Sequence, residues 1–359
     1  MNQVNPAILH HKYSLEDGHV AAQVTNVDGY RGIMITDKSD EYRKNSPFPS
    51  VLSLQSIKQN PQVIKQLKIV GYHIHHGSLA PKFQFLKEKH GLPMIVSFRG
   101  NDATAYPKKK KKNLQRLREL FQSGDLFLPV CEHLKNEIVK LGCPENKIRV
   151  LYGGVNLDRF QYRARQLKEN KKIRFLAVGR FVEKKGFSHL ISAFAAVKKQ
   201  HSNVVLTLIG KGPCEDEYRK LIRKHGLGGS VKIVSWASYK TIHKKYYRSH
   251  IFCAPSCTDQ NGNQEGIPNT LKEAMATGMP VISTTHAGIP ELVTNKVNGL
   301  LVPEGSVSSL AKAMNWMIQH PERWETLGEN ARKKIEKDFN LTLQLKKQKG
   351  FYDEVLTMR

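Results

Sequence analysis

The segment CAPSCTDQNGNQEGIPNTLKEAMATGMPVIST, residues 253–284, holds a strand end, a polar loop, a helix and a second strand in close succession. An apolar run ends at Cys253, glycines interrupt the loop at positions 262 and 266, and a helical pattern begins near Asn269. Strand, helix and strand in this order form the unit from which parallel sheets are built. The segment therefore predicts an α/β protein whose polar loops, at the carboxyl ends of the strands, bind the ligand.

The same alternation of short apolar runs and helical patterns extends in both directions. The strands predicted in the first half are Ala7–His10, Arg31–Thr36, Ile69–His75, Pro93–Phe98, Leu126–Val130 and Ile148–Leu151. Those predicted in the second half are Ile173–Val178, Val204–Ile209, Val231–Val234, Ile251–Ala254, Pro280–Ser283 and Leu300–Val302. Two such sets in 359 residues predict two doubly wound, Rossmann-like domains that face each other across a ligand-binding cleft.

The predicted domain limits follow from a polar stretch between the two sets. We expect an N-terminal domain over residues 1–160, a linker over 161–172 and a second domain over 173–338. A C-terminal helix over residues 339–359 is expected to pack back toward the N-terminal domain.

The chain is strongly basic, with 57 Lys and Arg against 31 Asp and Glu and a formal charge of +26. The excess is spread over both halves, which favours polyanionic partners, although a lysine-rich, solvated surface explains it equally well. A composition of 40% hydrophobic and 25% charged residues excludes a disordered chain. We find no apolar stretch of membrane-spanning length and no secretory signal, so a cytoplasmic protein is expected.

The first loop of the second domain, AVGRFVEKKG over residues 177–186, combines glycine with basic side chains. Arg180 follows the strand directly, and Lys184 and Lys185 precede Gly186, where a helix begins. The planar fork of arginine and the point charge of lysine suit a diphosphate. The alternative is an ordinary basic surface loop.

Glu265 and Glu273 stand eight residues apart, one before the predicted helix and one two turns inside it. Both carboxylates can accept hydrogen bonds from sugar or ribose hydroxyls. Between them, the backbone amides of Asn269 and Thr270 form a helix N-terminus, which favours phosphate. Taken alone, Glu273 is also compatible with a solvated carboxylate on a helix.

In combination, these segments resemble the retaining glycosyltransferases of family 4, which have the GT-B architecture of two Rossmann-like domains. The resemblance is dense over residues 172–305 and weaker in the first half. The matching pieces are GRFVEKKG (179–186), EGIPNTLKEAMATGMPVIST (265–284), HAGIPELV (286–293), NGLLVP (298–303), HIHHG (73–77), GLPMIVSFRGND (91–102) and LYGGVNLDRF (151–160).

The resemblance implies a nucleotide-diphosphate sugar, expected to be linked to UDP, as the donor substrate. By position, the implied donor contacts are Arg180 and Lys185 with the diphosphate, Asn269 and Thr270 with phosphate through their amides, Glu265 and Gly266 with the transferred sugar, Glu273 with the ribose, Trp236 with the base, and Gly18 in a reduced form of the family's glycine loop. No Asp-x-Asp pair occurs at a strand end, so no metal and no other cofactor is expected.

Two positions of the first domain depart from the family. Arg99 stands where many relatives have a histidine, and an arginine cannot act as a base, although it could bind an anionic acceptor or the phosphate. Glu265 remains a candidate catalytic residue, and Asp102 and His76, or the neighbouring His75, are the candidates in the first domain. For each histidine, a structural role is the favoured alternative.

A basic run at Lys108–Lys112 introduces NLQRLRELF, whose apolar residues recur at helical spacing. In family members that lie on membranes, such a segment docks on anionic lipid. The alternative is a helix that faces the core and carries a charged outer rim.

The sequence thus predicts a retaining glycosyltransferase that moves a sugar to a polysaccharide, lipid-linked or surface-glycan acceptor. Peripheral association with the inner face of the membrane is expected, and specific binding of nucleic acid is not. The alternatives are a sugar-nucleotide epimerase of the same fold and a non-catalytic binder of polyanions or membrane surfaces.

Overall fold

The computed structural model describes residues 5–11, 18–36, 50–167 and 172–356. The chain forms two compact units, which we call unit 1 (residues 1–154 and 341–359) and unit 2 (residues 155–340). The chain passes between the units at 154–155 and at 340–341, so the linker predicted over 161–172 is wrong. The reason is that Arg165 is buried in unit 2, where it donates hydrogen bonds to the carbonyls of Ser249, Tyr246 and Thr277.

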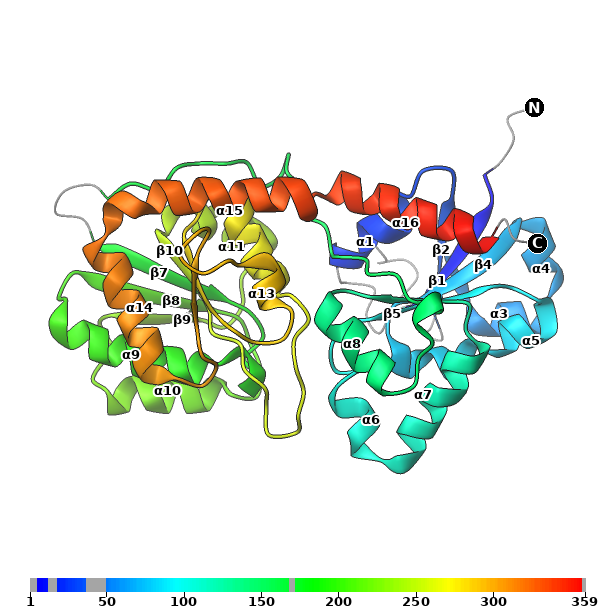
Figure 1. The fold of residues 1–359 in the computed structure, drawn as a ribbon, viewed down its shortest axis with the longest axis horizontal. Coiled ribbons are helices and arrows are strands. Elements are labelled where there is room, and N and C mark those ends of the chain that lie inside the picture. Colours follow the sequence, from blue (N-terminus) through cyan, green and yellow to red (C-terminus); the bar gives the residue numbers. More distant parts are fainter. Residues whose placement is uncertain (1–4, 12–17, 37–49, 168–171, 357–359) are drawn as a thin grey trace. The chain divides into compact units, whose positions relative to one another are not determined.

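Unit 1 contains a parallel sheet of six strands in the order β3-β2-β1-β4-β5-β6 (Figure 1). Its strands are β1 (Ala7–His11), β2 (Arg31–Thr36), β3 (Val51–Ser53), β4 (Ile69–Ile74), β5 (Met94–Phe98) and β6 (Leu126–Pro129). The short edge strand β3 was not predicted. The predicted strand Ile148–Leu151 is reduced to a single bridge between Ile148 and Phe127, although the amides of Arg149 and Leu151 also donate to carbonyls of β6.

Unit 2 contains a second parallel sheet of six strands in the order β12-β11-β10-β7-β8-β9. Its strands are β7 (Ile173–Val178), β8 (Val204–Ile209), β9 (Val231–Val234), β10 (Ile251–Ala254), β11 (Val281–Thr284) and β12 (Leu300–Val302). All six agree with the predicted strands to within one residue. They are buried between helices on both faces, which is why continuous apolar runs mark them so clearly in the sequence.

The connections between parallel strands decide which helix covers which face of each sheet. In unit 2, the steps from β7 to β8 to β9 and from β10 to β11 to β12 run in opposite directions, so right-handed crossovers place their helices on opposite faces. The helices of unit 2 are η3 (Glu183–Lys185), α9 (Phe187–Gln200), α10 (Glu215–Lys224), α11 (Tyr239–Arg248), α12 (Asn269–Ala276), α13 (Ile289–Leu292), α14 (Val307–Gln319), η4 (Pro321–Arg323) and α15 (Trp324–Asp338). Helix α9 packs against α10 and α14, and α12 packs against α15.

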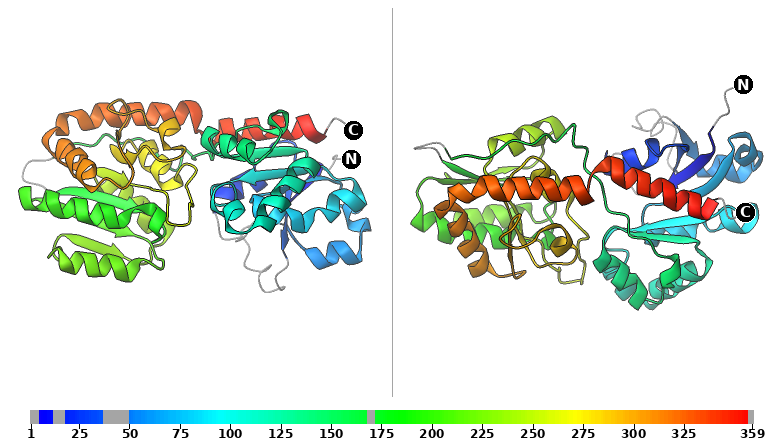
Figure 2. Two further views of the ribbon diagram at one scale, coloured as in Figure 1. Left: turned by 60° about the horizontal axis from the view of Figure 1, so that its bottom comes forward. Right: turned by 45° about the horizontal axis from the view of Figure 1, so that its top comes forward.

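Unit 1 is completed by the last helix of the chain (red in Figure 2). The helices of unit 1 are α1 (Gly18–Thr25), α3 (Leu54–Gln59), α4 (Gln62–Gln66), η1 (Gly77–Phe83), α5 (Phe85–His90), α6 (Ala105–Lys109), α7 (Lys111–Ser123), α8 (Glu132–Lys140), η2 (Glu145–Lys147) and α16 (Leu341–Leu356). Tyr352 of α16 lies in an apolar cluster with Ile8 of β1 and Ile95 of β5. Within the described ranges, no helix combines the length and the apolar character that crossing a bilayer requires.

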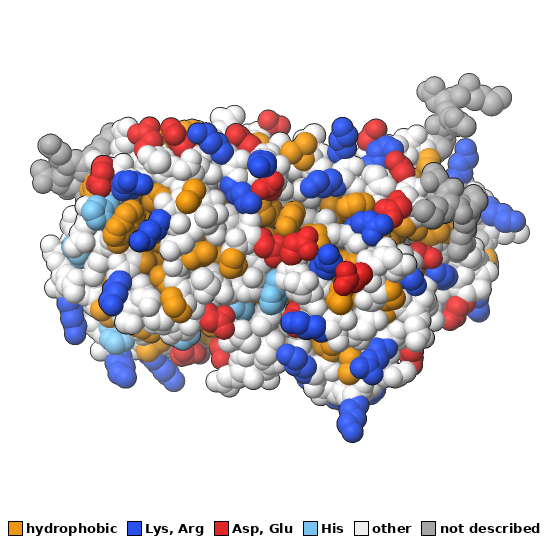
Figure 3. Space-filling view, viewed as in Figure 1, with side chains coloured by type: hydrophobic (Ala, Val, Ile, Leu, Met, Phe, Trp, Pro, Cys, Tyr) orange, Lys and Arg blue, Asp and Glu red, His pale blue; other side chains and the backbone are white. Residues whose placement is uncertain are grey.

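The basic run lies on α6 and α7. Its five lysines are exposed, and Lys and Arg side chains gather over these helices in Figure 3. Leu117, Leu120 and Phe121 are instead buried in unit 1, where the Phe121 ring contacts the ring of Phe98. The apolar face of α7 therefore belongs to the core, and only the charged rim faces outward.

Candidate functional site

Each sheet has one point at which the strand order reverses, and α/β proteins bind ligands outside the carboxyl ends of the strands at that point. In unit 2 this point lies between β10 and β7. The loops that follow these two strands are residues 179–186 and 255–268. They carry Arg180, Lys185 and Glu265, so the fold brings together residues that stand about eighty positions apart in the sequence.

Glu265 is held between two lysines of the other loop. Its Oε2 lies 3.1 Å from the Lys185 ammonium and its Oε1 lies 3.2 Å from the Lys184 ammonium. Burial alone would raise the pKa of Glu265, but the charges of Lys185 and Lys184 lower it to about 2. Glu265 is therefore a permanent carboxylate that can accept hydrogen bonds from hydroxyl groups.

Lys184 does not face outward as a loop lysine would. It is buried, and its ammonium also contacts Asn263 Oδ1 at 3.2 Å and the Gln264 carbonyl at 3.3 Å. Its contacts thus lie on three consecutive residues of the loop that carries Glu265. Lys184 is therefore a positioning residue. The side chain of Lys185 is more exposed, at 14% against 8% for Lys184.

His286 and Glu304 support Glu265 from its backbone side, and sequence analysis assigned neither a role. The Glu265 amide donates to Nε2 of His286 at 3.1 Å, so Nδ1 of the neutral ring carries the proton and faces the Glu304 carboxylate. Thr258 Oγ1 donates to the same carboxylate at 3.2 Å. The motifs HAGIPELV and NGLLVP lead to these residues, but no local pattern indicates that they meet.

Glu273 has different surroundings from Glu265. It is buried in α12, and Tyr246 donates a hydrogen bond of 2.8 Å to its Oε2. Burial raises the pKa of Glu273 to about 7. Nearby, the Arg159 guanidinium lies 3.5 Å from the ring centre of Tyr239.

The remaining unit 2 residues predicted from sequence lie around the start of α12 and the ends of β7 and β9. Thr270 Oγ1 donates to the carbonyl of Val178, which ties the N-terminus of α12 to the end of β7. The amides of Asn269 and Thr270 have no hydrogen-bond partner among the described residues. Arg180 is exposed at the end of β7, Gly266 is buried just before α12, and the Trp236 ring is 70% exposed after β9.

Asp102, predicted as a candidate catalytic residue, positions backbone loops in unit 1, and its catalytic role stays a prediction. It is fully buried and accepts hydrogen bonds from the backbone amides of Arg99 at 2.9 Å, Gly100 at 3.0 Å and Gly77 at 2.8 Å. Both of its oxygens are therefore committed to the loops after β4 and β5. Sequence analysis could not detect this, because a carboxylate that organises a loop and one that contacts substrate look alike in a motif.

His76 and Gly18 are the other predicted residues of unit 1. The His76 side chain is partly exposed, with Nδ1 hydrogen-bonded to Ser78 Oγ at 2.7 Å and 3.8 Å from Asp102 Oδ2. His76 remains a prediction. Gly18 is the first residue of α1, and the loop before it lies outside the described residues.

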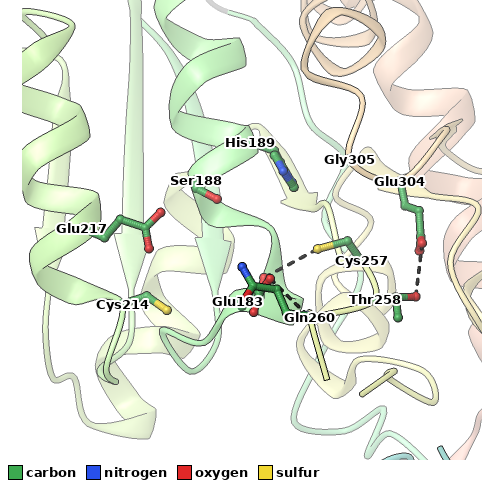
Figure 4. Close-up of a pocket in the computed structure, with 10 residues that line it drawn as sticks. All are labelled: Glu183, Ser188, His189, Cys214, Glu217, Cys257, Thr258, Gln260, Glu304 and Gly305. Atoms are coloured by element: carbon green, nitrogen blue, oxygen red, sulfur yellow. Dashed lines mark hydrogen bonds between the residues drawn. The ribbon is translucent and has the colours of Figure 1, made fainter. Parts of the chain in front are cut away.

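A separate pocket of about 390 Å³ lies near the starts of α9, α10 and α14 in unit 2 (Figure 4). It is lined by Glu183, Ser188, His189, Cys214, Glu217, Cys257, Thr258, Gln260, Glu304 and Gly305. None of the site residues predicted from sequence lines it. Its wall nevertheless contains Glu304, the partner of His286. One of the two residues that support Glu265 therefore borders this pocket.

With this geometry established, comparisons with known proteins identify the family. A family model described as Glycosyltransferase Family 4 matches residues 14–159, and a model described as Glycosyl transferases group 1 matches residues 158–334. The two matches adjoin and span most of the sequence. The chain therefore belongs to the group 1, family 4 glycosyltransferases.

Two curated relatives are similar in sequence. The amylovoran biosynthesis glycosyltransferase AmsK of Erwinia amylovora is 34% identical over 266 residues, which cover 74% of this chain and 64% of AmsK. The putative colanic acid biosynthesis glycosyltransferase WcaL of Escherichia coli K12 is 35% identical over 224 residues, covering 62% of this chain and 55% of WcaL. The chain thus spans less than two thirds of the length of these relatives.

Two solved structures are similar in fold. Anabaena Alr3699/HepE in complex with UDP superposes with a TM-score of 0.79 at 16% identity, covering 98% of this chain and all of HepE. The sucrose-phosphate synthase of Thermosynechococcus elongatus superposes with a TM-score of 0.76 at 18% identity, covering 99% of this chain and all of the synthase. These similarities confirm the predicted fold, a GT-B fold of two Rossmann-like units.

Proposed function

We propose that the protein is a retaining glycosyltransferase that transfers a sugar from a UDP-sugar to a polysaccharide, lipid-linked or surface-glycan acceptor. The observation that carries this proposal is the Glu265 carboxylate, held by two lysines beside the open N-terminus of α12. The relatives AmsK and WcaL are named for the biosynthesis of amylovoran and colanic acid, and HepE binds UDP, which supports the same class of reaction.

The donor diphosphate binds at the end of β7. Arg180 and the free amides of Asn269 and Thr270 supply hydrogen-bond donors and positive potential, and Lys185 adds a mobile charge. As the sugar–phosphate bond breaks, negative charge grows on the leaving diphosphate, and these groups stabilise it. They take the place of a divalent cation, so the reaction is independent of metal.

The two glutamates act on different parts of the donor. Glu265 accepts hydrogen bonds from hydroxyls of the transferred sugar, and its fixed charge favours the positive character that develops at the anomeric carbon. Glu273 accepts hydrogen bonds from the ribose hydroxyls, and the exposed Trp236 offers a surface for the base. The acceptor hydroxyl approaches on the face from which the diphosphate departs, and a leaving oxygen takes its proton, which retains the anomeric configuration.

We further propose that unit 1 rests on the cytoplasmic face of an anionic membrane through the lysines of α6 and α7. Because the apolar face of α7 is buried, this association is electrostatic and involves no insertion. A membrane surface would bring the enzyme to a lipid-linked acceptor.

The test is a panel of UDP-, GDP- and ADP-sugars offered to the purified full chain with and without lipid-linked oligosaccharide acceptors. We expect release of UDP from one UDP-sugar, strongly accelerated by an acceptor and unchanged by a metal chelator. Glu265→Gln should abolish turnover, whereas the exposed Glu325→Gln on α15 should be neutral. A converted sugar nucleotide formed without acceptor would identify an epimerase instead, and failure of every sugar nucleotide to react would contradict the proposal.

A further inference from the structure

Three histidines of unit 1 form a buried cluster at the point where its strand order reverses. His10 is the last residue but one of β1, His73 pairs with it near the end of the adjacent strand β4, and His75 follows that strand directly. All three are buried, and one ring nitrogen from each lies within 4.8 Å of the others. This is the ligand-binding position of a doubly wound sheet, which raises the question of what the cluster does.

The hydrogen bonds of the cluster do not fit a metal site. His73 uses both ring nitrogens, on Tyr352 OH at 2.7 Å and on Ser97 Oγ at 2.7 Å. His75 also uses both, on His10 Nδ1 at 3.0 Å and on the Arg99 guanidinium at 3.0 Å. A cation here would displace these bonds and would lie beside the positive charge of Arg99.

The cluster instead fixes the position of Arg99. An arginine can only donate, so Nδ1 of His75 accepts from Arg99 Nη2, and Nε2 of His75 carries the proton that it donates to His10. Nε of Arg99 donates to the His75 carbonyl at 3.0 Å, and Nη2 also donates to Gln23 Oε1 at 2.9 Å. The groups that fix the orientation of the Arg99 guanidinium, namely the ring and carbonyl of His75 and the amide of Gln23, are thus all neutral.

Arg99 forms no ion pair among the described residues, although the charge of the nearby Asp102 carboxylate favours its charged form. Asp102, the acid beside it in the loop, is bonded to backbone amides, and no carboxylate of the described ranges forms an ion pair with Arg99. Its Nη1 group likewise has no acceptor there. A desolvated charge is costly unless it is paired, and the planar guanidinium matches the two oxygens of a carboxylate or phosphate.

We propose that Arg99 binds an anionic group of the acceptor, a carboxylate or a phosphate, at the carboxyl end of β5. This inference rests on the proposed transferase function and adds the chemical class of the acceptor to it. The neutral histidines and Gln23 orient the guanidinium before the acceptor arrives, so that little side-chain entropy is lost on binding. A neutral sugar of the same shape leaves the charge unpaired and binds weakly.

The experiment titrates the full chain with glucuronate, glucose 6-phosphate and glucose at constant ionic strength, following binding by NMR. At least one of the two anions should bind at least tenfold more tightly than glucose, and the stronger of the two identifies the carboxylate or the phosphate as the natural group. Arg99→Gln should remove this preference, and Arg99→Lys, which keeps the charge but loses the fork, should reduce it. Arg116→Gln, an exposed arginine of α7, is the matched control and should leave it unchanged.

UDP binding to the same variants separates this inference from the proposed function. Because UDP is assigned to unit 2, Arg99→Gln should bind UDP as the wild type does, which also shows that the variant is folded. Wild-type chain that binds neither anion better than glucose would overturn the inference, and so would a preference that survives both Arg99 substitutions. Loss of UDP affinity in folded Arg99→Lys would assign Arg99 to the donor phosphate instead.

Discussion

Replacing Lys184 or Lys185 by methionine separates a lysine that holds the fold from a lysine that binds the donor. Lys184 contacts three consecutive residues through Asn263 Oδ1, the Gln264 carbonyl and Glu265 Oε1, and its side chain is 8% exposed. Among the described residues, the Lys185 ammonium forms an ion pair only with Glu265, and its side chain is 14% exposed. Methionine keeps an unbranched side chain of nearly the same length and removes the ammonium, with its charge and its hydrogen-bond donors.

The structure sets the size of the effect. The pKa of Glu265, about 2 instead of 4.5, corresponds to a net stabilisation of roughly 3 kcal/mol at neutral pH, which remains after the two lysines have offset the cost of burying the carboxylate. Lys184→Met removes about half of this and two further bonds from a charged donor, so we expect a loss of about 3 kcal/mol in the free energy of unfolding. For a unit of this size that is a fall of about 6–12 °C in Tm.

Lys185→Met should cost about half as much stability but weaken UDP binding more than tenfold, because it loses a charge-assisted bond to the diphosphate. Calorimetric unfolding and titration with UDP measure the two effects on the same samples.

Since the pKa of Glu265 is lowered, the stabilisation is complete above about pH 4.5 and is lost as the pH falls toward 2. The Tm difference between wild type and Lys184→Met should shrink over that interval. Equal Tm values for both variants, or a larger loss of UDP affinity in Lys184→Met, would refute the assignment.

The other predictions concern Glu273, His286 and the basic rim. Glu273→Gln should weaken UDP about tenfold. Because the pKa of Glu273 is raised to about 7, its contribution to stability is present below about pH 4.5 and is lost as the pH rises through 7, by about 3 kcal/mol in all. Between about pH 4.5 and 7, the Tm of Glu273→Gln should depend less on pH than the Tm of the wild type. An unchanged pH dependence would show that the Glu273 carboxyl does not cause it. His286→Ala frees the Glu265 amide and should lower turnover far more than UDP affinity, whereas equal losses would show that the ring supports the whole site. Sedimentation with vesicles should show binding that needs anionic lipid, weakens with salt and falls when Lys108–Lys112 are replaced by glutamine; equal binding to neutral vesicles would exclude the electrostatic attachment.

The strands and the order of motifs could be predicted because they leave local patterns. A buried parallel strand such as Ile173–Val178 is a continuous apolar run, and all the strands of unit 2 were found in this way. The edge strand Val51–Ser53 was not predicted, because three half-buried residues leave almost no hydrophobic pattern in the sequence. The polar stretch after residue 160 was misread as a linker because its charge is satisfied inside unit 2, by carbonyls more than eighty residues away.

The contacts within the candidate site could not be predicted from the sequence. The sequence indicates that Glu265 and Lys185 belong to one site, but it does not show that Lys184 turns inward or that His286 holds the Glu265 backbone. These are long-range pairings, which depend on how the loops after β7, β10 and β11 pack. The sequence likewise did not show that the Asp102 carboxylate accepts hydrogen bonds from backbone amides.

We propose that the loops after β7 and β10, with the start of α12, bind the nucleoside diphosphate of a sugar donor. Titration calorimetry of UDP into the full chain and into Arg180→Ala tests it most directly, because Arg180 is exposed at the end of β7 and its loss should leave the fold intact. We expect saturable binding of UDP to the wild type and an affinity at least tenfold lower in Arg180→Ala. In the absence of ligand, the two proteins should have the same Tm. Absence of UDP binding to the wild type, or equal affinity in both proteins, would contradict it.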